Sequence, residues 1–362
     1  MLVTLGIDIG NSKVKFCALK LKNKELTAIW ESYSLPYTHN RRLDFEIGFY
    51  QRLEDFLNKK LLMKKTDIDL AICCSSNSYS FTTFDLGVLH TAQILKDNFS
   101  NNIKIISANG ELYSPDEVLS MYGINLYRFA LTNFYGSAYL GSKLIKNGIS
   151  IDIGTTTTDI IPIKDGEIDP DNLKYPDNYI EHRYSSKKIN WYGMTITPLC
   201  FLTDSIPLNG KKYSIVPRDY YTDLVISVLE LMDIKLIQRH AYFDYFPNNN
   251  TSASKIAQFI GLDDKLLSYK DIKKIAQYLY KRLIDKIVSS IRYVIKTEFK
   301  DYKLNEIEIA SFALGQDVLT KPAIIKAGLN ENNIKTLQDK RNNLWTVTSA
   351  YALALKAFEI LN

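Results

Sequence analysis

The chain has 362 residues, 46% of them hydrophobic and 23% charged, which is typical of a folded protein of two domains and excludes a disordered or fibrous one. Its 45 basic and 40 acidic residues leave a net charge of +5, too even a balance to indicate nucleic-acid binding. Without an apolar run near the roughly 20 residues of a membrane span, and without an export signal at its start, the sequence predicts a cytoplasmic protein with no membrane partner.

The first part of the chain alternates between strand and helix patterns. Strands are expected at 2–9, 14–21, 26–35, 69–74 and 104–107, with helices over 45–62 and 85–96. Three strands followed by helix, strand, helix and strand describe one ribonuclease-H-like α/β unit. A first domain is therefore expected at 1–132.

The second part repeats the opening. Ser150-Ile-Asp152-Ile-Gly154 follows Gly6-Ile-Asp8-Ile-Gly10 by 144 positions, and such a spacing indicates a duplicated domain, here expected at 133–342. A polar surface excursion is expected at 165–188, with helices at 133–146, 219–232, 252–259, 271–296 and 343–361 and a strand at 307–314. The four cysteines and four histidines have no metal-binding spacing, so reduced and buried thiols are expected.

Each repeat ends a strand with an aspartate, a glycine and small polar residues. Glycine lets a ligand approach the backbone, and the N–H and hydroxyl groups of such a turn can hold phosphate oxygens. A carboxylate repels phosphate, so Asp8 and Asp152 are expected to hold Mg²⁺ that neutralises it. Two such turns across a cleft would hold a polyphosphate from both sides, and the candidate ligand-binding residues are Gly10, Asn11, Ser12, Gly154, Thr155, Thr156 and Thr157.

The paired hairpins resemble the phosphate motifs of the actin, hexokinase and heat-shock ATPase superfamily. The resemblance implies an α/β fold of two ribonuclease-H-like domains flanking a ligand cleft, with the last helix (343–362) packed back on the first domain. It also implies a cation on the first hairpin, where Lys15 stands with Lys13 on the same strand face. The third motif would end at Gly315. Ala313 stands there where a glycine is expected, which favours diphosphate over ATP as the ligand.

A narrower resemblance covers most of the chain. Ile151-Asp-Ile-Gly-Thr-Thr-Thr-Thr-Asp-Ile-Ile-Pro-Ile163 and Gly193-Met-Thr-Ile-Thr-Pro198 are similar to an archaeal family labelled hydantoinase/oxoprolinase-like or tetrahydromethanopterin-linked one-carbon-transfer protein. The family makes the aryl ether of methanofuran, so the resemblance implies a transferase that joins an aminomethylfuran-methyl diphosphate to the phenol of γ-glutamyltyramine, a tyramine derivative, with release of pyrophosphate. Ile196 replaces an expected arginine, which leaves the exact substrates open.

The resemblance suggests roles for several residues. Mg²⁺ near Asp8 and Asp152, together with Lys15 and the threonine hydroxyls, would neutralise the departing diphosphate. Asp159 is the candidate base for the phenol, with a purely structural carboxylate as the equal alternative. Trp191 and Tyr192 could stack on a furan or tyrosine-like ring, although a place in the core explains them as well.

Two other functions stay open. The opening residues also resemble type III pantothenate kinases, which implies an ATP-dependent small-molecule kinase, although the block from Gly193 to Gly210 has no counterpart there. The third option is a non-catalytic, actin-like protein that binds a phosphate ligand and signals by cleft closure. The oligomeric state is open too, a homodimer being one option.

Overall fold

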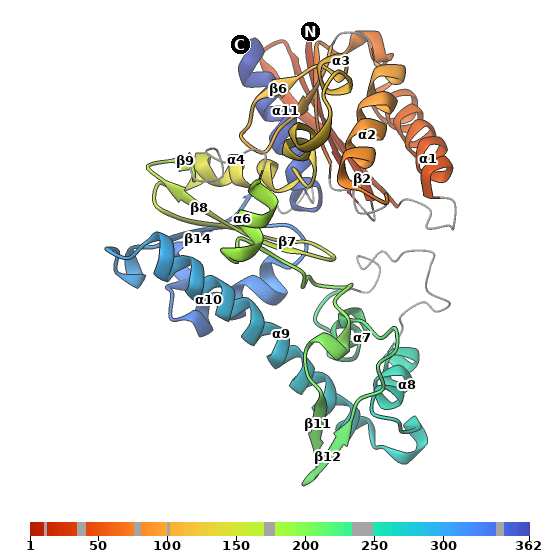
Figure 1. Ribbon diagram of the computed structural model, residues 1–362, viewed down its shortest axis with the longest axis vertical. Helices are drawn as coiled ribbons and strands as arrows, with labels where there is room; N and C mark the ends of the chain where they lie inside the picture. The colour runs from red at the N-terminus through yellow and green to blue at the C-terminus, as the bar shows by residue number, and fades with distance from the viewer. Residues whose placement is uncertain are drawn as a thin grey trace.

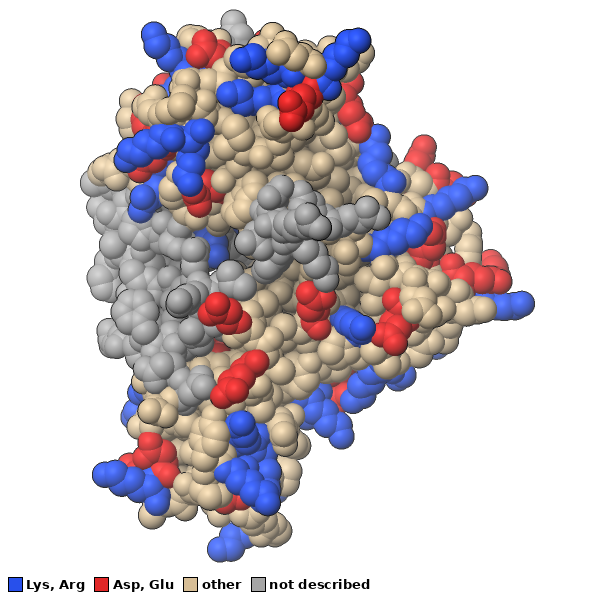
Figure 2. Space-filling view, turned by 180° about the vertical axis from the view of Figure 1, so that it is seen from behind, with Lys and Arg blue, Asp and Glu red and all other residues tan. Residues whose placement is uncertain are grey.

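Two β-sheets, one above the other in Figure 1, form the body of the molecule, and a smaller third part extends below them. The structure is a computed structural model that describes residues 1–10, 13–34, 41–75, 81–99, 102–169, 178–233, 249–337 and 344–362. None of the described helices is both long and apolar enough to cross a lipid bilayer. On the face seen in Figure 2, Lys and Arg side chains are mixed with Asp and Glu.

The first sheet has the strand order β3-β2-β1-β4-β5-β6. Its strands are β1 (Leu2–Ile9), β2 (Lys13–Lys22), β3 (Glu25–Ser34), β4 (Leu70–Ser75), β5 (Ile103–Ile106) and β6 (Leu112–Tyr113). The first three run antiparallel, and β4 and β5 run parallel to β1. The central strand β1 is buried on both faces, which suits its nearly continuous apolar sequence.

Helices cover both faces of this sheet. Its helices are α1 (Arg41–Asp55), which continues as a π-helix (Phe56–Leu61), α2 (Phe84–Asn98) and α3 (Pro115–Leu119). Val3, Leu5, Ile7 and Ile9 share a core with α1 and α2. The alternate residues Thr4, Gly6 and Asp8 face the last helix, α11 (Thr348–Leu361): the Thr4 hydroxyl donates to the Ala354 carbonyl at 2.8 Å, and a Cβ on Gly6 would lie 1.8 Å from the Ala350 carbonyl oxygen. This helix therefore lies directly against β1.

The second sheet repeats the plan of the first. Its order is β10-β8-β7-β13-β14, with β9 paired to β8. The strands are β7 (Gly148–Ile153), β8 (Thr158–Lys164), β9 (Glu167–Ile168), β10 (Ile189–Asn190), β13 (Glu308–Phe312) and β14 (Ile334–Lys335). Again three strands run antiparallel and two run parallel to the first. The expected pair of ribonuclease-H-like domains is thereby confirmed, while the boundary at 132/133 stays a prediction.

The second sheet lies between two helices. On one face is α4 (Phe134–Leu144), and on the other is the 30-residue helix α9 (Tyr269–Glu298). The remaining helices are α6 (Tyr179–Ser185), α7 (Thr222–Val228), α8 (Asn249–Phe259) and α10 (Lys321–Ala327), with the π-helix Gln316–Thr320 and short 3₁₀ turns at Lys65–Asp67, Gly123–Phe129, Leu199–Phe201, Asp264–Leu266, Leu304–Glu306, Glu331–Asn333 and Leu344–Val347. The two-stranded sheet of β11 (Ser205–Leu208) and β12 (Lys211–Ser214) packs with α7 and α8 at the lower end of α9.

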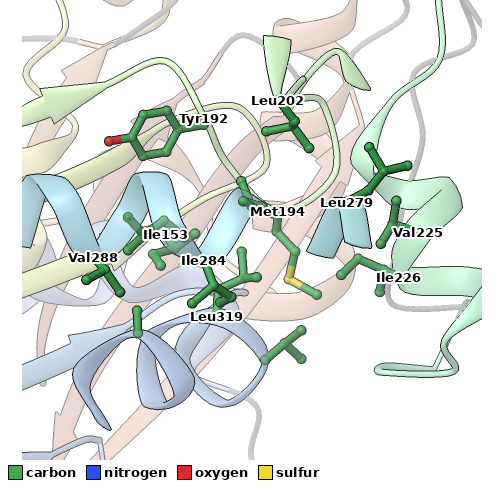
Figure 3. Close-up of a cluster of buried hydrophobic side chains, with 14 of the residues drawn as sticks. Ile153, Tyr192, Met194, Leu202, Val225, Ile226, Leu279, Ile284, Val288 and Leu319 are labelled. Atoms are coloured by element: carbon green, nitrogen blue, oxygen red, sulfur yellow. The ribbon is translucent and has the colours of Figure 1, made fainter. Parts of the chain in front are cut away.

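One apolar cluster ties the lower part to the second sheet. Met194 is fully buried and points between α7 and α9, next to Ile226 and Ile284 (Figure 3). The same cluster includes Ile153 at the end of β7 and Tyr192, whose hydroxyl pairs with Ser290. The backbone from Tyr192 to Met194 is therefore fixed against the end of β7 by the core.

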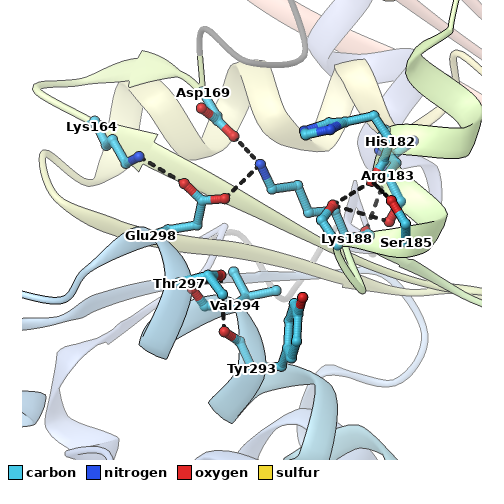
Figure 4. Close-up of polar contacts among 11 residues, drawn as sticks. Lys164, Asp169, His182, Arg183, Ser185, Lys188, Tyr293, Val294, Thr297 and Glu298 are labelled. Atoms are coloured by element: carbon cyan, nitrogen blue, oxygen red, sulfur yellow. Dashed lines mark hydrogen bonds and ion pairs between the residues drawn. The ribbon is translucent and has the colours of Figure 1, made fainter.

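Most described residues of the polar stretch at 165–188 are exposed or partly exposed, as its composition suggests, but a few of its charged residues are buried. It contains α6, and Lys188 is completely buried, where it forms ion pairs with Asp169 and, at 2.8 Å, with Glu298 of α9 (Figure 4). Lys164 also contacts Glu298 at 2.8 Å. The buried charges neutralise one another inside the fold, which composition alone does not reveal.

The prediction of reduced, buried thiols is confirmed for three of the four cysteines. All four are free thiols, and Cys17, Cys73 and Cys74 are buried, while Cys200 is partly exposed. Burial raises the pKa of Cys73 and Cys74 well above its usual value, with the Asp8 carboxylate adding to the effect. Both therefore remain neutral thiols at physiological pH.

Candidate functional site

The two repeated hairpins fold into equivalent turns. In the first, the Gly10 N–H donates to the Lys13 carbonyl at 2.9 Å; in the second, the Gly154 N–H donates to the Thr157 carbonyl at 3.0 Å. Asn11 and Ser12, two of the expected phosphate ligands, lie outside the described residues. The strand register places a residue directly across from each aspartate: Lys15 opposite Asp8 and Asp159 opposite Asp152.

Asp8 is enclosed, and its charge is balanced by a lysine. Only 1% of the residue is exposed, and its Oδ2 accepts hydrogen bonds from Lys15 Nζ at 2.8 Å and from Ser349 Oγ at 2.7 Å. Its buried Oδ1 meets no N–H or O–H donor among the described residues.

Lys15 is held as a cation. Burial lowers its pKa, but the charges of Asp8 and Asp152 outweigh that effect and leave the pKa above its ordinary value. Lys13, on the same strand, has a pKa lowered to about 8 by burial and by the neighbouring Lys15 charge. Of the two lysines, Lys15 is thus the permanent positive charge of the first hairpin.

Asp152 is the partly exposed carboxylate of the pair. Burial raises its pKa to about 6; the charges of Asp159 and Asp8 add to this rise, whereas the hydrogen bond from Ser137 Oγ and the charge of Lys15 oppose it. The charges of Asp8 and Lys15 thus act on Asp152 from the other hairpin. The structure brings the two strand ends together, as the duplicated motif predicts.

Two serines on different helices hold the two aspartates. Ser137 lies on α4 and Ser349 on α11, and the helices touch so closely that a Cβ on Gly136 would lie 2.6 Å from the Cα of Ser349. Both serines belong to a Ser-Ala-Tyr triplet, at 137–139 and 349–351. Sequence reasoning missed them, although this second internal repeat was the signal that could have found them.

The threonine turn rests on the backbone of residues 193–195. Thr155, Thr156 and Thr157 are partly exposed. Beneath them the Met194 N–H donates to the Gly154 carbonyl at 2.9 Å, and the Thr195 N–H donates to the Thr155 carbonyl at 3.0 Å. The contact requires a glycine at 193, because a Cβ there would lie 2.7 Å from the backbone carbons of Thr155 and Thr156.

Asp159 is engaged away from the turn. Its carboxylate accepts from Arg183 Nη2 at 2.6 Å, and both side chains are buried. Burial raises the pKa of Asp159 while the Arg183 charge lowers it, and burial prevails. The Arg183 guanidinium also lies 3.6 Å from the centre of the Phe134 ring. These contacts support the structural alternative for Asp159 rather than the role of base.

The turn before Gly315 has the backbone of the expected glycine motif. Ala313 adopts a left-handed conformation with φ +62°, which glycine adopts without strain. The Gly315 N–H donates to the Ile153 carbonyl at 3.0 Å, and a Cβ on Gly315 would lie 2.6 Å from Ile153 Cβ. Gly315 is therefore needed for packing against the end of β7.

The two aromatic residues expected to stack on a substrate ring, Trp191 and Tyr192, lie in different surroundings. Tyr192 belongs to the core, with its hydroxyl bonded to Asn190 and Ser290. Trp191 instead lines a cavity beside α6.

The described parts of the chain contain no group of three or more side chains that could together bind a metal ion. A cation at the hairpins would therefore be coordinated by the two aspartates and by oxygens of its own ligand. Mg²⁺ is commonly held in this way.

Comparison with known proteins agrees with the motifs. No family model matches the sequence. The chain is 22% identical over 344 residues to a protein of Methanocaldococcus jannaschii, a match that spans 93% of this chain and 92% of the relative. It is 27% identical over 209 residues to a protein of Methanococcus vannielii, covering 56% and 86%. Both relatives are named as the synthase of a furan-2-yl methanamine that carries a γ-L-glutamylaminoethyl-phenoxymethyl group. The predicted resemblance to the aryl-ether synthase family is confirmed.

Solved structures of similar shape include component A of the (R)-2-hydroxyglutaryl-CoA dehydratase of Acidaminococcus fermentans, with a TM-score of 0.47 and 13% identity over 99% of both chains. Another is the activator of the 2-hydroxyisocaproyl-CoA dehydratase of Clostridium difficile, with a TM-score of 0.47 and 12% identity over 99% of this chain and 95% of the activator.

Proposed function

We propose that the protein is a transferase that joins an aminomethylfuran-methyl diphosphate to the phenol oxygen of γ-glutamyltyramine and releases pyrophosphate. The observation that carries the proposal is the similarity to synthases of this aryl ether over nearly the whole chain. The site is compatible with it, because Lys15 stands beside Asp8 in the first hairpin and its charge acts on Asp152 of the second.

The reaction needs little covalent help from the protein. The bond between the furan-methyl carbon and the diphosphate oxygen breaks, the phenol oxygen bonds to that carbon, and the phenol proton passes to the departing pyrophosphate or to water. The leaving diphosphate gains negative charge, which Lys15 is placed to stabilise while Asp8, itself held by a hydrogen bond from Ser349, accepts from the Lys15 ammonium group. The partly exposed hydroxyls of Thr155 and Thr156 would donate to the same oxygens. When bound, Mg²⁺ would supply further positive charge, with Asp152 and Asp8 as the residues to hold it.

The test measures pyrophosphate release by the purified protein. Release that requires both substrates and Mg²⁺, yields the aryl ether and consumes no ATP would support the proposal. Phosphorylation of pantothenate at the expense of ATP would replace it with the kinase alternative. If neither reaction occurs, or if a reaction proceeds unchanged in D152N and in Lys15→Met, the proposed transferase site is wrong.

A further inference from the structure

A cavity of about 400 Å³ lies between the helices of the first domain and α6 of the second. Phe84 at the start of α2 and Tyr127 line it from one side, and Glu181, Tyr184, Ile189 and Trp191 from the other. In Figure 1, α6 lies between the second sheet and the helices of the first domain. A volume of this size is at the lower end of the range for small-molecule sites, which suits one ring with a short side chain.

The cavity lies close to the threonine turn in the fold. Ile189 is paired with Asp159 across the edge of the second sheet. Trp191 comes directly before Tyr192, whose carbonyl accepts from Thr158 Oγ1 at 2.6 Å. Gly193, the next residue, packs on Thr155 and Thr156. A molecule in the cavity would therefore be a neighbour of a ligand held by the turn.

The lining selects for one kind of chemistry. Four of its side chains are aromatic, and Phe84 and Tyr127 already meet edge to face with their ring centres 6.0 Å apart. Glu181 is its single carboxylate and forms no ion pair with any described residue, and no Lys, Arg or His is among the described residues that line the cavity. Aromatic walls favour a flat ring, and both the carboxylate and the ring faces favour a cation over an anion.

We propose that this cavity binds an aromatic ring that carries a primary ammonium group, with the ring against Trp191 and Phe84 and the ammonium at Glu181. The link to catalysis rests on the proposed function, in which the aminomethylfuran end of the donor has this chemistry, whereas the tyramine nitrogen of the acceptor is an uncharged amide. The donor's ring would be held beside the diphosphate turn by a site that spans both domains.

The test is a titration of the full-length protein with small probes, without Mg²⁺ or diphosphate, followed by calorimetry and by intrinsic tryptophan fluorescence, to which Trp191 contributes with two other tryptophans. Furan-2-ylmethanamine and tyramine are the ammonium probes, and 2-methylfuran and 4-ethylphenol are their neutral counterparts. We expect furan-2-ylmethanamine to bind ten times or more tightly than 2-methylfuran, which would identify the aminomethylfuran end of the donor as the occupant. A preference confined to the tyramine pair would uphold the aromatic-ammonium site but reject the donor as its occupant.

Glu181→Gln should remove the preference for the ammonium probe. The control is Glu167→Gln, which changes an exposed glutamate of β9 that does not line the cavity and should leave the preference intact. Because Glu181 has no partner in the described structure, its replacement should not disturb folding, which a thermal melt checks. Equal binding of charged and neutral probes, absence of binding, or an unchanged preference in Glu181→Gln would each overturn the proposal. Selective probe binding by a protein that forms no aryl ether would uphold the cavity site and reject the proposed reaction.

Discussion

Lys15 and Asp159 occupy equivalent positions in the two hairpins, each directly across the strand pair from the aspartate that ends the first strand. The first position carries a cation that pairs with its aspartate. The second carries a carboxylate that is neutralised by Arg183 from the other side, so Asp152 has no comparable partner. The duplicated hairpins have therefore diverged in charge: one provides a fixed ammonium group, and the other a carboxylate available to a metal ion.

Lys15→Met should reduce both activity and stability. The change leaves the buried Asp8 carboxylate with Ser349 as its main partner, which should lower the free energy of unfolding by about 2–3 kcal/mol. Urea denaturation measures this loss. The double variant Lys15→Met with Asp8→Asn should recover most of the stability, because the unpaired charge is gone, but not the pyrophosphate release. Recovery of activity in the double variant would contradict the role of Lys15 as the cation of the site.

The acid limb of the pH profile should report Asp152. If its ionised form is needed, kcat/KM should fall as the pH drops through about 6, the raised pKa of this carboxyl. Ser137→Ala removes a hydrogen bond that lowers this pKa, so the limb should move to higher pH. A limb that does not move in Ser137→Ala would assign the titration to another group.

The raised pKa of Asp152 also makes the stability of the protein depend on pH. Because the folded-state pKa of Asp152 is raised from 3.8 to about 6, the folded protein holds this proton more tightly than the unfolded chain does. Its contribution to stability is therefore complete below about pH 3.8 and is lost as the pH rises through about 6. Comparison of the wild-type protein with Asp152→Asn across this range isolates the effect, since the amide does not titrate.

Two glycine variants should separate folding from ligand approach. A Cβ at Gly154 would meet its nearest neighbour among the described residues, the Thr157 carbonyl oxygen, only at 3.7 Å, so Gly154→Ala should fold normally. If an anion approaches this turn, however, the same methyl group should reduce kcat/KM tenfold or more. In Gly193→Ala, by contrast, the new Cβ would lie 2.7 Å from backbone atoms of Thr155 and Thr156 in the turn, so this variant should have a lower melting temperature. Full activity in Gly154→Ala would move the ligand away from this turn.

The buried lysine of Figure 4 should matter more than an exposed one. Lys188→Met leaves Asp169 and Glu298 without their shared cation, so the free energy of unfolding should fall by about 3–5 kcal/mol. The matched control is Lys143→Met, whose partner Glu359 is also on the surface, with an expected loss below about 1 kcal/mol. Similar losses in the two variants would show that the buried network contributes nothing special.

The sequence predicts the parts of this fold that depend on local pattern. Both strand-turn motifs carry a signal of their own, because the aspartate, the glycine and the alternating apolar residues stand together in the chain. The partners of these aspartates do not: Ser349 lies 341 positions from Asp8 and reaches it only through the packing of α11 on β1. In the same way, Arg183 and Lys188 are polar residues in a polar stretch, and only the fold shows that they are buried beside carboxylates.

Ala313→Gly should stabilise the protein. Alanine in the left-handed region costs about 1–2 kcal/mol, and the φ of +62° at this residue places it there. Glycine relieves that strain but gains freedom in the unfolded chain, which offsets about 0.4–1 kcal/mol. A net gain of up to about 1.6 kcal/mol in the free energy of unfolding is therefore expected, measured by urea denaturation. Ala310→Gly, on the buried strand β13 with ordinary extended backbone, serves as the control and should destabilise the protein. Equal losses in the two variants would mean that the turn at 313 is not strained by its side chain.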